Sequence, residues 1–285
     1  MSFRLLLLFA CITRLALAGT ANDDAIALFK AKRYPDSREA FEKVVAAEPK
    51  NAEAHYYLGM LAKRRNDNDE AIHQLEQATA LAPANSDYFA DLGDAYGTAA
   101  SGAGLFAKPG WALKCQAALE KSVALNPDNL GARNGLVTYY RQAPTFLGGG
   151  LSKAYEQAAE IKKRDPIMGA AVYGQLFLAE KKYDEAFATF EDVLKVSPDN
   201  YLALYSIGRT AAQTGLRLDR GEQTLRRCLE IPPGKGDPGH AGVQWRLGNI
   251  AEKRGNPAAA REHYKAGLKD DPNFTQLTDA LAKLK

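Results

Sequence analysis

The sequence predicts an all-α protein. We expect an α-solenoid of seven antiparallel helix pairs, closed by a C-terminal capping helix and preceded by a cleavable signal peptide. Two observations lead to this prediction: prolines recur at intervals of 34, 44, 39, 32, 35 and 39 residues, and a fixed pattern of small and apolar residues precedes each one. Self-similarity at about 20–50 residues is typical of stacked repeats. The prolines are Pro49, Pro83, Pro127, Pro166, Pro198, Pro233 and Pro272.

The composition limits the possible classes of protein. Of the 285 residues, 46% are hydrophobic and 25% are charged, and the formal net charge is +3. These values are ordinary for a globular protein and argue against a disordered chain, a collagen or a multi-span membrane protein. A charge so close to zero also argues against a nucleic-acid binder with a broad basic face.

The first element, residues 1–18, has the pattern of an export signal. Arg4 supplies a positive start, residues 5–12 are apolar, and Ala16 and Ala18 are the small residues before a cleavage site. The apolar run is far shorter than the ~20 residues of a membrane-spanning helix. An uncleaved anchor or an apolar first helix is the alternative. We expect an exported protein, located in a bacterial periplasm.

The three cysteines raise two questions. Leu8-Phe9-Ala10-Cys11 partly resembles the cysteine box of bacterial lipoproteins, so a lipid-anchored assembly subunit at the envelope is an alternative. Phe9 is too bulky for a good match. Cys115 and Cys228 lie three predicted repeats apart, too far to form a disulfide in an extended stack. We expect both to be small buried residues.

The second helix of each predicted pair has three residues on one face. They stand twelve, eight and five residues before the proline, and offsets of four and three place them on one side of a helix. Small residues at the first position allow another helix to approach closely. The three sets are Ser37, Ala71, Cys115, Ala154, Ala186, Gly221 and Ala260; Phe41, Leu75, Leu119, Ala158, Phe190, Leu225 and Tyr264; and Val44, Ala78, Ser122, Ile161, Val193, Cys228 and Gly267.

The first helix of most pairs is marked by a large residue followed by glycine. Four of the helices are preceded by Pro-x-Asn, in which proline ends one helix and asparagine caps the next. The asparagines are Asn51, Asn85, Asn129 and Asn200. The large-Gly pairs are Leu58-Gly59, Leu92-Gly93, Tyr173-Gly174, Ile207-Gly208 and Leu247-Gly248.

This pattern resembles the tetratricopeptide repeat (TPR) family, in which a helix pair of about 34 residues is the unit. The predicted signal peptide covers residues 1–18 and a superhelical domain covers 19–285. Four positions depart from the family pattern. The glycine of the first helix is replaced by Ala25 and Val137, and the usual alanine of the second helix is replaced by Ser37 and Gly221. The repeats are predicted at 22–51, 52–85, 86–129, 130–168, 169–200, 201–240 and 241–274, with the cap at 275–285.

Repeats 3 and 4 are longer than the others. We expect about ten extra residues in a turn over 97–111 and about five in a turn over 141–151. Insertions of neighbouring repeats emerge on one edge of the stack, so the two turns should lie close together. Their apolar side chains either pack on the protein's own edge or form a partner-contact site. These side chains are Leu105, Phe106, Trp111, Phe146 and Leu147.

The resemblance implies a partner-binding groove. TPR proteins bind peptides or extended protein segments along the concave face formed by the first helices. Carried over by repeat position, that face comprises Tyr56, Met60, Lys63, Arg64, Asp87, Asp94, Asn134, Arg141, Gln175, Tyr205, Arg209, Trp245 and Asn249. A solvated face with scattered aromatics is the alternative. One subtype grips a C-terminal carboxylate with Lys, Asn and Arg from two repeats, and no consecutive pair of repeats here has that set.

Catalytic and metal-binding patterns are absent from the sequence. His55, His73, His240 and His263 show no metal-ligand spacing with Cys or carboxylates. No serine or cysteine stands in a nucleophile motif. We therefore expect a non-catalytic protein that has no cofactor and binds protein or peptide partners. A cryptic hydrolase or transferase is the alternative, and it would require paired polar residues in one pocket.

The first prediction concerns the mature N-terminus. Cleavage after Ala18 gives a chain that begins at Gly19, because Ala16 and Ala18 fit the small-residue positions of the processing site. Intact-mass spectrometry of the protein from its native host tests this. A mature chain beginning at an acylated Cys11 would contradict it.

Overall fold

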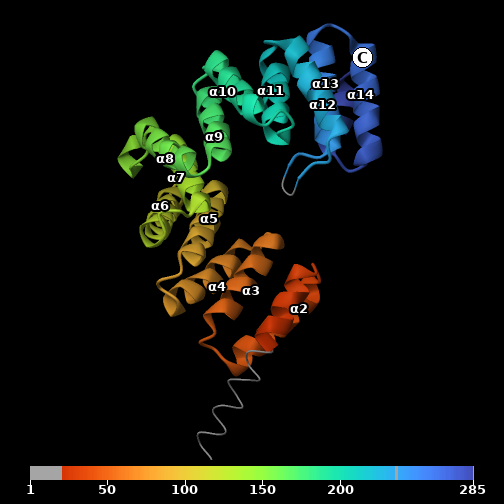
Figure 1. Ribbon diagram of the computed structural model, residues 1–285. Helices are drawn as coiled ribbons and strands as arrows, with labels where there is room; N and C mark the ends of the chain where they lie inside the picture. The colour runs from red at the N-terminus through yellow and green to blue at the C-terminus, as the bar shows by residue number, and fades with distance from the viewer. Residues whose placement is uncertain (1–20, 235–236, 285) are drawn as a thin grey trace, which may run out of the picture. The chain divides into compact units, whose positions relative to one another are not determined.

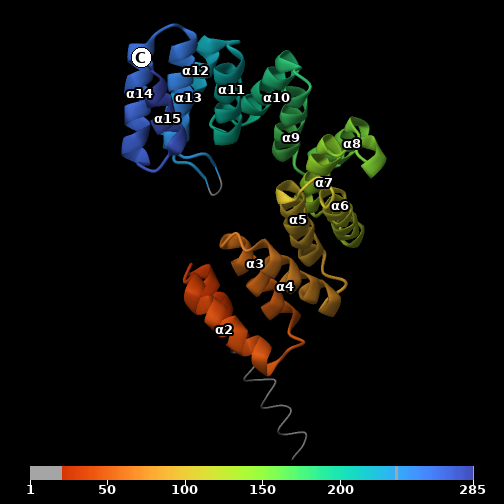
Figure 2. The ribbon, with the colours of Figure 1, turned by 180° about the vertical axis from the view of Figure 1, so that it is seen from behind.

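The computed structural model describes residues 21–234 and 237–284, and in this part of the chain the regular structure is entirely helical (Figures 1 and 2). The predicted signal peptide, including Cys11, lies outside the described residues. The chain divides into two units, Met1–Gln157 and Ala158–Lys285, called unit 1 and unit 2 below.

Unit 1 consists of consecutive antiparallel helices. A helix over residues 21–30 is followed by α2 (Tyr34–Ala47), α3 (Ala52–Arg64), α4 (Asn68–Leu81), α5 (Ser86–Gly102), α6 (Lys108–Leu125), α7 (Leu130–Gln142), the short 3₁₀ helix η1 (Thr145–Leu147) and α8 (Leu151–Arg164), within which the unit ends. Each helix from α2 to α6 contacts the next one, and α5 also contacts α7.

Unit 2 is also built of consecutive helices. It contains α9 (Pro166–Ala179), α10 (Tyr183–Val196), α11 (Tyr201–Thr214), α12 (Leu218–Glu230), α13 (His240–Lys253), α14 (Pro257–Asp270) and the short α15 (Thr275–Lys283). On α15, Leu277 is fully buried and Leu281 packs on the same cluster around Tyr264. The last helix therefore covers the apolar end of the final pair.

Asparagine caps start several first helices, as the Pro-x-Asn pattern predicts. The side-chain oxygens of Asn51, Asn129 and Asn200 accept hydrogen bonds from backbone N–H groups three residues later, at 2.9–3.0 Å. Each cap satisfies an N–H group that has no partner within the helix. Asn85 does the same at α5, where it accepts from two N–H groups.

The core confirms the predicted pattern of the second helices. All three sets of residues, at twelve, eight and five positions before the proline, are buried in every pair. The first-helix glycines pack on the middle set. A Cβ atom on Gly59 would lie 2.7 Å from Cγ of Leu75, and one on Gly208 would lie 2.2 Å from Cγ of Leu225. These distances leave no room for a side chain, so the two helices of a pair are in backbone-to-side-chain contact.

Two local predictions are wrong. The expected turn over 97–111 is largely helical, because α5 continues to Gly102 and α6 begins at Lys108. Thr98 and Ser101 do not break α5, since their hydroxyls donate to backbone carbonyls one turn earlier, at 3.1 and 3.0 Å. The inserted residues therefore lengthen both helices and leave a turn over 103–107.

The boundary between repeats 4 and 5 is the second correction. The first helix of repeat 5 begins at Pro166, not at residue 169. Proline fits the first turn of a helix, because the backbone N–H groups of that turn have no acceptor within the helix and the missing N–H of proline therefore costs no hydrogen bond. Asp165 caps this helix by accepting from the N–H of Met168 at 2.9 Å.

The two described cysteines are unpaired and buried, which confirms that Cys115 and Cys228 do not form a disulfide. Burial raises the pKa of the Cys115 thiol to about 11 and that of Cys228 to about 12. Both thiols therefore stay protonated at neutral pH and behave as small apolar side chains.

The close packing of glycines gives a second prediction. Gly59→Ala should lower the free energy of unfolding by about 1–3 kcal/mol, because its Cβ would overlap the fully buried Leu75. Gly110→Ala is the matched control in unit 1, since a Cβ there meets nothing within 4 Å in helix α6. That change should raise stability by up to about 1 kcal/mol. Urea denaturation followed by circular dichroism measures the free energy of unfolding of both variants. An equal change in this free energy for Gly59→Ala and Gly110→Ala would contradict this packing.

Candidate functional site

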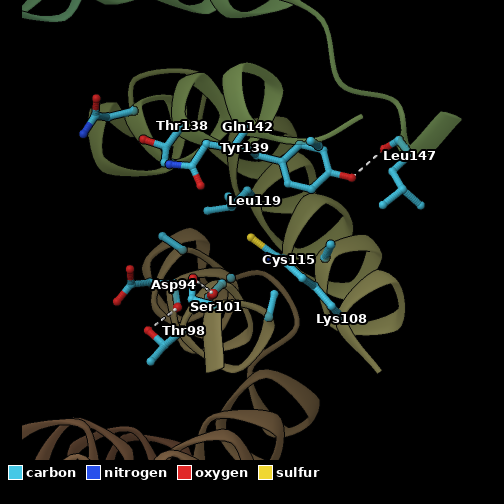
Figure 3. Close-up of a pocket in the computed structure, with 18 of the residues that line it drawn as sticks. Asp94, Thr98, Ser101, Lys108, Cys115, Leu119, Thr138, Tyr139, Gln142 and Leu147 are labelled. Carbon is cyan, nitrogen blue, oxygen red and sulfur yellow. Dashed lines mark hydrogen bonds between the residues drawn. The ribbon is translucent and has the colours of Figure 1, made fainter. Parts of the chain in front are cut away.

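A groove with a volume of about 1130 Å³ lies in unit 1. Helices α5 and α7 form its two walls, α6 lies beneath them, and the turns at 103–107 and 143–150 border one end. Figure 3 shows Asp94, Thr98 and Ser101 on the α5 side, Thr138 and Gln142 on the α7 side, and the sulfur of Cys115 between the two walls. We call this cavity the α5–α7 groove.

Small residues keep the α5–α7 groove open. Gly93 and Gly97 line the α5 wall and Gly135 lines the α7 wall. A Cβ atom on Gly93 or on Gly135 would lie 2.7 or 2.9 Å from the side chain of Leu119, which forms the floor. One leucine thus supports both walls, and the walls carry little side-chain bulk above it.

The end of the groove near the start of α5 is negatively charged. Asp87, Asp91 and Asp94 line it, and Lys63 of α3 forms ion pairs at 2.9 Å with both Asp91 and Asp94. Burial lowers the pKa of Lys63, but the two carboxylates outweigh that effect and the net shift is upward. The hydroxyl of Tyr56 donates to Asp91 at 2.9 Å. One ammonium group against three carboxylates leaves an excess of negative charge.

The opposite end of the groove is formed by a firmly held turn over 143–150. The hydroxyl of Tyr139 donates to the carbonyl of Leu147 at 2.5 Å, as Figure 3 shows, and the N–H of Gly150 donates to the carbonyl of Tyr140 at 2.8 Å. Gly148 has a φ of +81°, and a Cβ on Gly149 would lie 1.8 Å from the carbonyl oxygen of Ala143. Glycine is therefore required at both positions.

Apolar side chains project from both turns at this end. Phe146 is 82% exposed, Leu105 is 82% exposed and Phe106 is 99% exposed. Leu105, Phe146 and the half-buried Leu147 line the groove. Trp111 differs, because its ring packs 5.8 Å from Tyr96 with the ammonium of Lys114 at 4.8 Å. The α5–α7 groove thus has one charged end and one apolar end.

Only part of the predicted concave face lines this groove. Tyr56, Asp87, Asp94 and Asn134 do so, together with the three turn residues. In the same unit, Met60, Lys63, Arg64 and Arg141 do not; Arg64, for example, stacks on the ring of Tyr34 at 3.9 Å. The other predicted residues belong to unit 2: Gln175, Tyr205, Arg209, Trp245 and Asn249.

Two residues of unit 2 are less available than the sequence predicts. Tyr205 is only 7% exposed and packs within the core. The amide of Asn249 donates to the hydroxyl of Tyr264 at 3.1 Å. The sequence interpretation missed the small wall residues of the groove, although Ala90, Gly93 and Gly97 have the i, i+3, i+7 spacing of one helix face.

The chemistry of the groove favours binding. Its lining contains no histidine within the described part of the chain, and its only thiol, Cys115, has a raised pKa. A protonated thiol without a neighbouring base is a poor nucleophile. Across residues 21–234 and 237–284 there is no cluster of three or more side chains suited to a metal ion, and none of the helices is both long and apolar enough to span a membrane.

The stacked helix pairs define a helical-repeat protein, and comparison with known families identifies the type of repeat. The model of the tetratricopeptide repeat family matches residues 22–85, 59–100, 174–235 and 223–273, which is more than half of the chain. The chain belongs to the tetratricopeptide repeat family. The unmatched stretch 101–173 contains α6, α7 and both turns that border the groove.

Solved structures show the same fold. A tetratricopeptide repeat protein from Parabacteroides merdae has a TM-score of 0.68 at 13% identity, covering 93% of this chain and 97% of that one. Human IFIT1, solved as a dimer with m7Gppp-AAAA, has a TM-score of 0.65 at 18% identity, covering 94% of this chain and 62% of that one. Identities this low show the fold alone.

Two curated relatives match part of the sequence. The "Protein STIP1 homolog" of Dictyostelium discoideum is 29% identical over 136 residues, which is 46% of this chain and 21% of that protein. The "Peroxisomal targeting signal receptor" of Yarrowia lipolytica is 26% identical over 187 residues, 64% of this chain and 30% of that protein. The chain therefore spans less than a third of either relative. Proteins of this family are generally non-catalytic scaffolds. Membership therefore supports a role for this chain in protein–protein interaction.

The turn at the apolar end gives a third prediction. Tyr139→Phe keeps the ring but removes the hydroxyl that donates to Leu147. Loss of one such bond costs about 1 kcal/mol, so the amide hydrogens of Gly149 and Gly150 should exchange about fivefold faster. Hydrogen exchange by mass spectrometry measures this. The control is Tyr88→Phe, because the Tyr88 hydroxyl has no hydrogen bond among the described residues; an equal effect there would contradict the assignment.

Proposed function

We propose that this protein is an exported, non-catalytic scaffold that binds a segment of a partner protein in the α5–α7 groove. The observation that supports this most directly is the preformed apolar end, where Phe146 is held in an exposed position by a hydrogen-bonded turn. The backbone of this turn is already ordered, so little backbone freedom is lost on binding, and an aromatic side chain is a typical anchor of protein interfaces.

The size of the groove favours a peptide segment as its occupant. Its volume of about 1130 Å³ lies above the range of about 300–1,000 Å³ that is usual for small-molecule pockets. The glycines of both walls allow another backbone to come close. A segment of a protein chain meets both conditions better than a compact small molecule does.

The charge distribution sets the direction of the bound segment. Apolar side chains of the partner fit against Leu105, Phe146 and Leu147, and a basic side chain fits near the acidic end at Asp87. Asp87 is exposed, and its carboxylate accepts only the amide of Asn129, at 2.9 Å, in the described residues. The favoured partner segment therefore has an apolar end and a basic end.

Export is the second part of the proposal and rests on the signal pattern of residues 1–18. A bacterial periplasm is the proposed compartment. Anchoring through a lipid on Cys11 is the competing arrangement, and it would place the same groove at a membrane surface. The mature N-terminus separates the two.

A fourth prediction tests the groove directly. A photo-cross-linking amino acid at Thr98, on the exposed α5 wall, should give a discrete adduct with one partner when the protein is illuminated in its native host. The same amino acid at Lys121, an exposed position of α6 outside the groove, should give none. Gel analysis and mass spectrometry of the adduct identify the cross-linked segment.

Removal of the aromatic anchor provides the matched comparison. Phe146→Ala should reduce the adduct yield at least about tenfold, because interface anchors typically contribute 2 kcal/mol or more. Val196→Ala removes an equally exposed apolar side chain from unit 2 and should leave the yield unchanged. Equal yields for both variants, or equal labelling from Lys121, would reject the groove as the binding site.

A further inference from the structure

Two arginines of unit 2 have no acidic partner among the described residues. Arg209 lies on α11 and Arg246 on α13, two helices in contact with each other. The Nε atom of each guanidinium is buried and has no hydrogen-bond acceptor. Neither side chain forms an ion pair with any residue that the structure describes.

Neighbouring arginines behave differently. Arg220 of α12 binds Glu191 through two hydrogen bonds of 2.8 Å, and Arg227 pairs with Asp199 at 2.8 Å. Arg220 and Arg227 therefore each have a carboxylate partner, and Arg209 and Arg246 have none among the described residues.

An arrangement of this kind destabilises the folded chain. A buried N–H without an acceptor loses its bonds to water and gains nothing in return. The two positive charges also repel each other. Burial is the main cause that lowers the pKa of Arg209; Tyr205 acts in the opposite direction, and the charge of Arg246 adds to the lowering. Packing alone would be served better by an uncharged side chain of similar size.

The surroundings of the pair suit a polar ligand with an apolar stem. The guanidinium of Arg246 lies 3.9 Å from the ring centre of Trp245. Tyr205 stands one turn before Arg209 on α11, and its hydroxyl lies 3.8 Å from the place that a Cβ would take on Gly242. The two guanidinium groups are hydrogen-bond donors only, and the Tyr205 hydroxyl can donate or accept, so donors outnumber acceptors around the pair and no carboxylate balances its charge.

We propose that Arg209 and Arg246 form a binding site for the carboxylate of an acidic side chain in a bound protein segment. The proposal rests on the role of this protein as a protein-binding scaffold, but it uses no residue of the α5–α7 groove. The planar fork of N–H donors in arginine matches the two oxygens of a carboxylate. One carboxylate between the two side chains would supply the missing acceptor and reduce their mutual repulsion.

The chain contains a built-in reporter for this site. It has two tryptophans, Trp111 and Trp245, so Trp111→Phe leaves only the indole next to Arg246. In this background, acetylated and amidated tetra-glutamate should produce a saturable change in fluorescence. Arg209→Gln and Arg246→Gln should each weaken its affinity by about tenfold, the effect expected for losing a charge-assisted hydrogen bond.

Three controls make the result specific. The amidated tetra-glutamine peptide should produce no change. A neutral tetra-alanine peptide with a free C-terminal carboxylate tests the other source of a carboxylate, and tight binding of that peptide alone would overturn the assignment to acidic side chains. Lys269→Gln removes the same charge from an exposed position of α14 and should leave the affinity for tetra-glutamate unchanged.

Thermal unfolding separates a binding role from a structural one. If the two arginines serve binding, they do not stabilise the fold. Arg209→Gln and Arg246→Gln should then leave Tm unchanged or raise it by about 2 °C. A fall of more than about 4 °C in both variants, or identical titrations with and without the arginines, would overturn the proposal. Failure here leaves the Phe146→Ala result unaffected, because that change lies in unit 1.

Discussion

The fold depends on one contact, made between a first-helix glycine and the large apolar residue of the second helix. Gly59 meets Leu75, Gly174 meets Phe190 and Gly248 meets Tyr264, each at a distance that excludes a Cβ atom. The helices of a pair can therefore approach until a side chain touches a backbone. This close approach buries the small residues that lie one turn earlier on the second helix. It also allows the two helices of a pair to be joined by only a few residues.

The α5–α7 groove arises where the same contact is made twice. Leu119 receives Gly93 from its own pair and Gly135 from the next helix. With both neighbours seated on one leucine, α5 and α7 present small side chains above it, and space remains between them. The longer helices of repeat 3 and the turn after α7 extend that space, so the groove is a local variation of the core packing.

Periodicity made the helices and the core predictable, because burial of one helix face imposes a spacing that survives changes of residue type. Ser37, Cys115 and Gly221 are all buried at one position despite their different chemistry. The helical run over 97–102 was not predictable in this way, since glycine, serine and threonine favour turns locally and packing on α6 decides otherwise. The burial of Tyr205 and the absence of an acceptor for Arg246 depend on neighbours from other helices.

The two candidate sites share a physical property that the core lacks. In the core, each apolar residue is covered, and most charged residues around it are paired. Phe146 is an aromatic held in the open by a rigid turn, and Arg246 is a cation whose Nε is buried without an acceptor. The exposed ring gains nothing from folding, and the buried Nε without an acceptor lowers the stability of the free protein; a bound molecule would give both groups favourable contacts. Departures from local consistency at otherwise well-packed positions are expected where a protein binds something. The apolar end of the groove and the arginine pair are therefore the places where a partner would add the most favourable contacts.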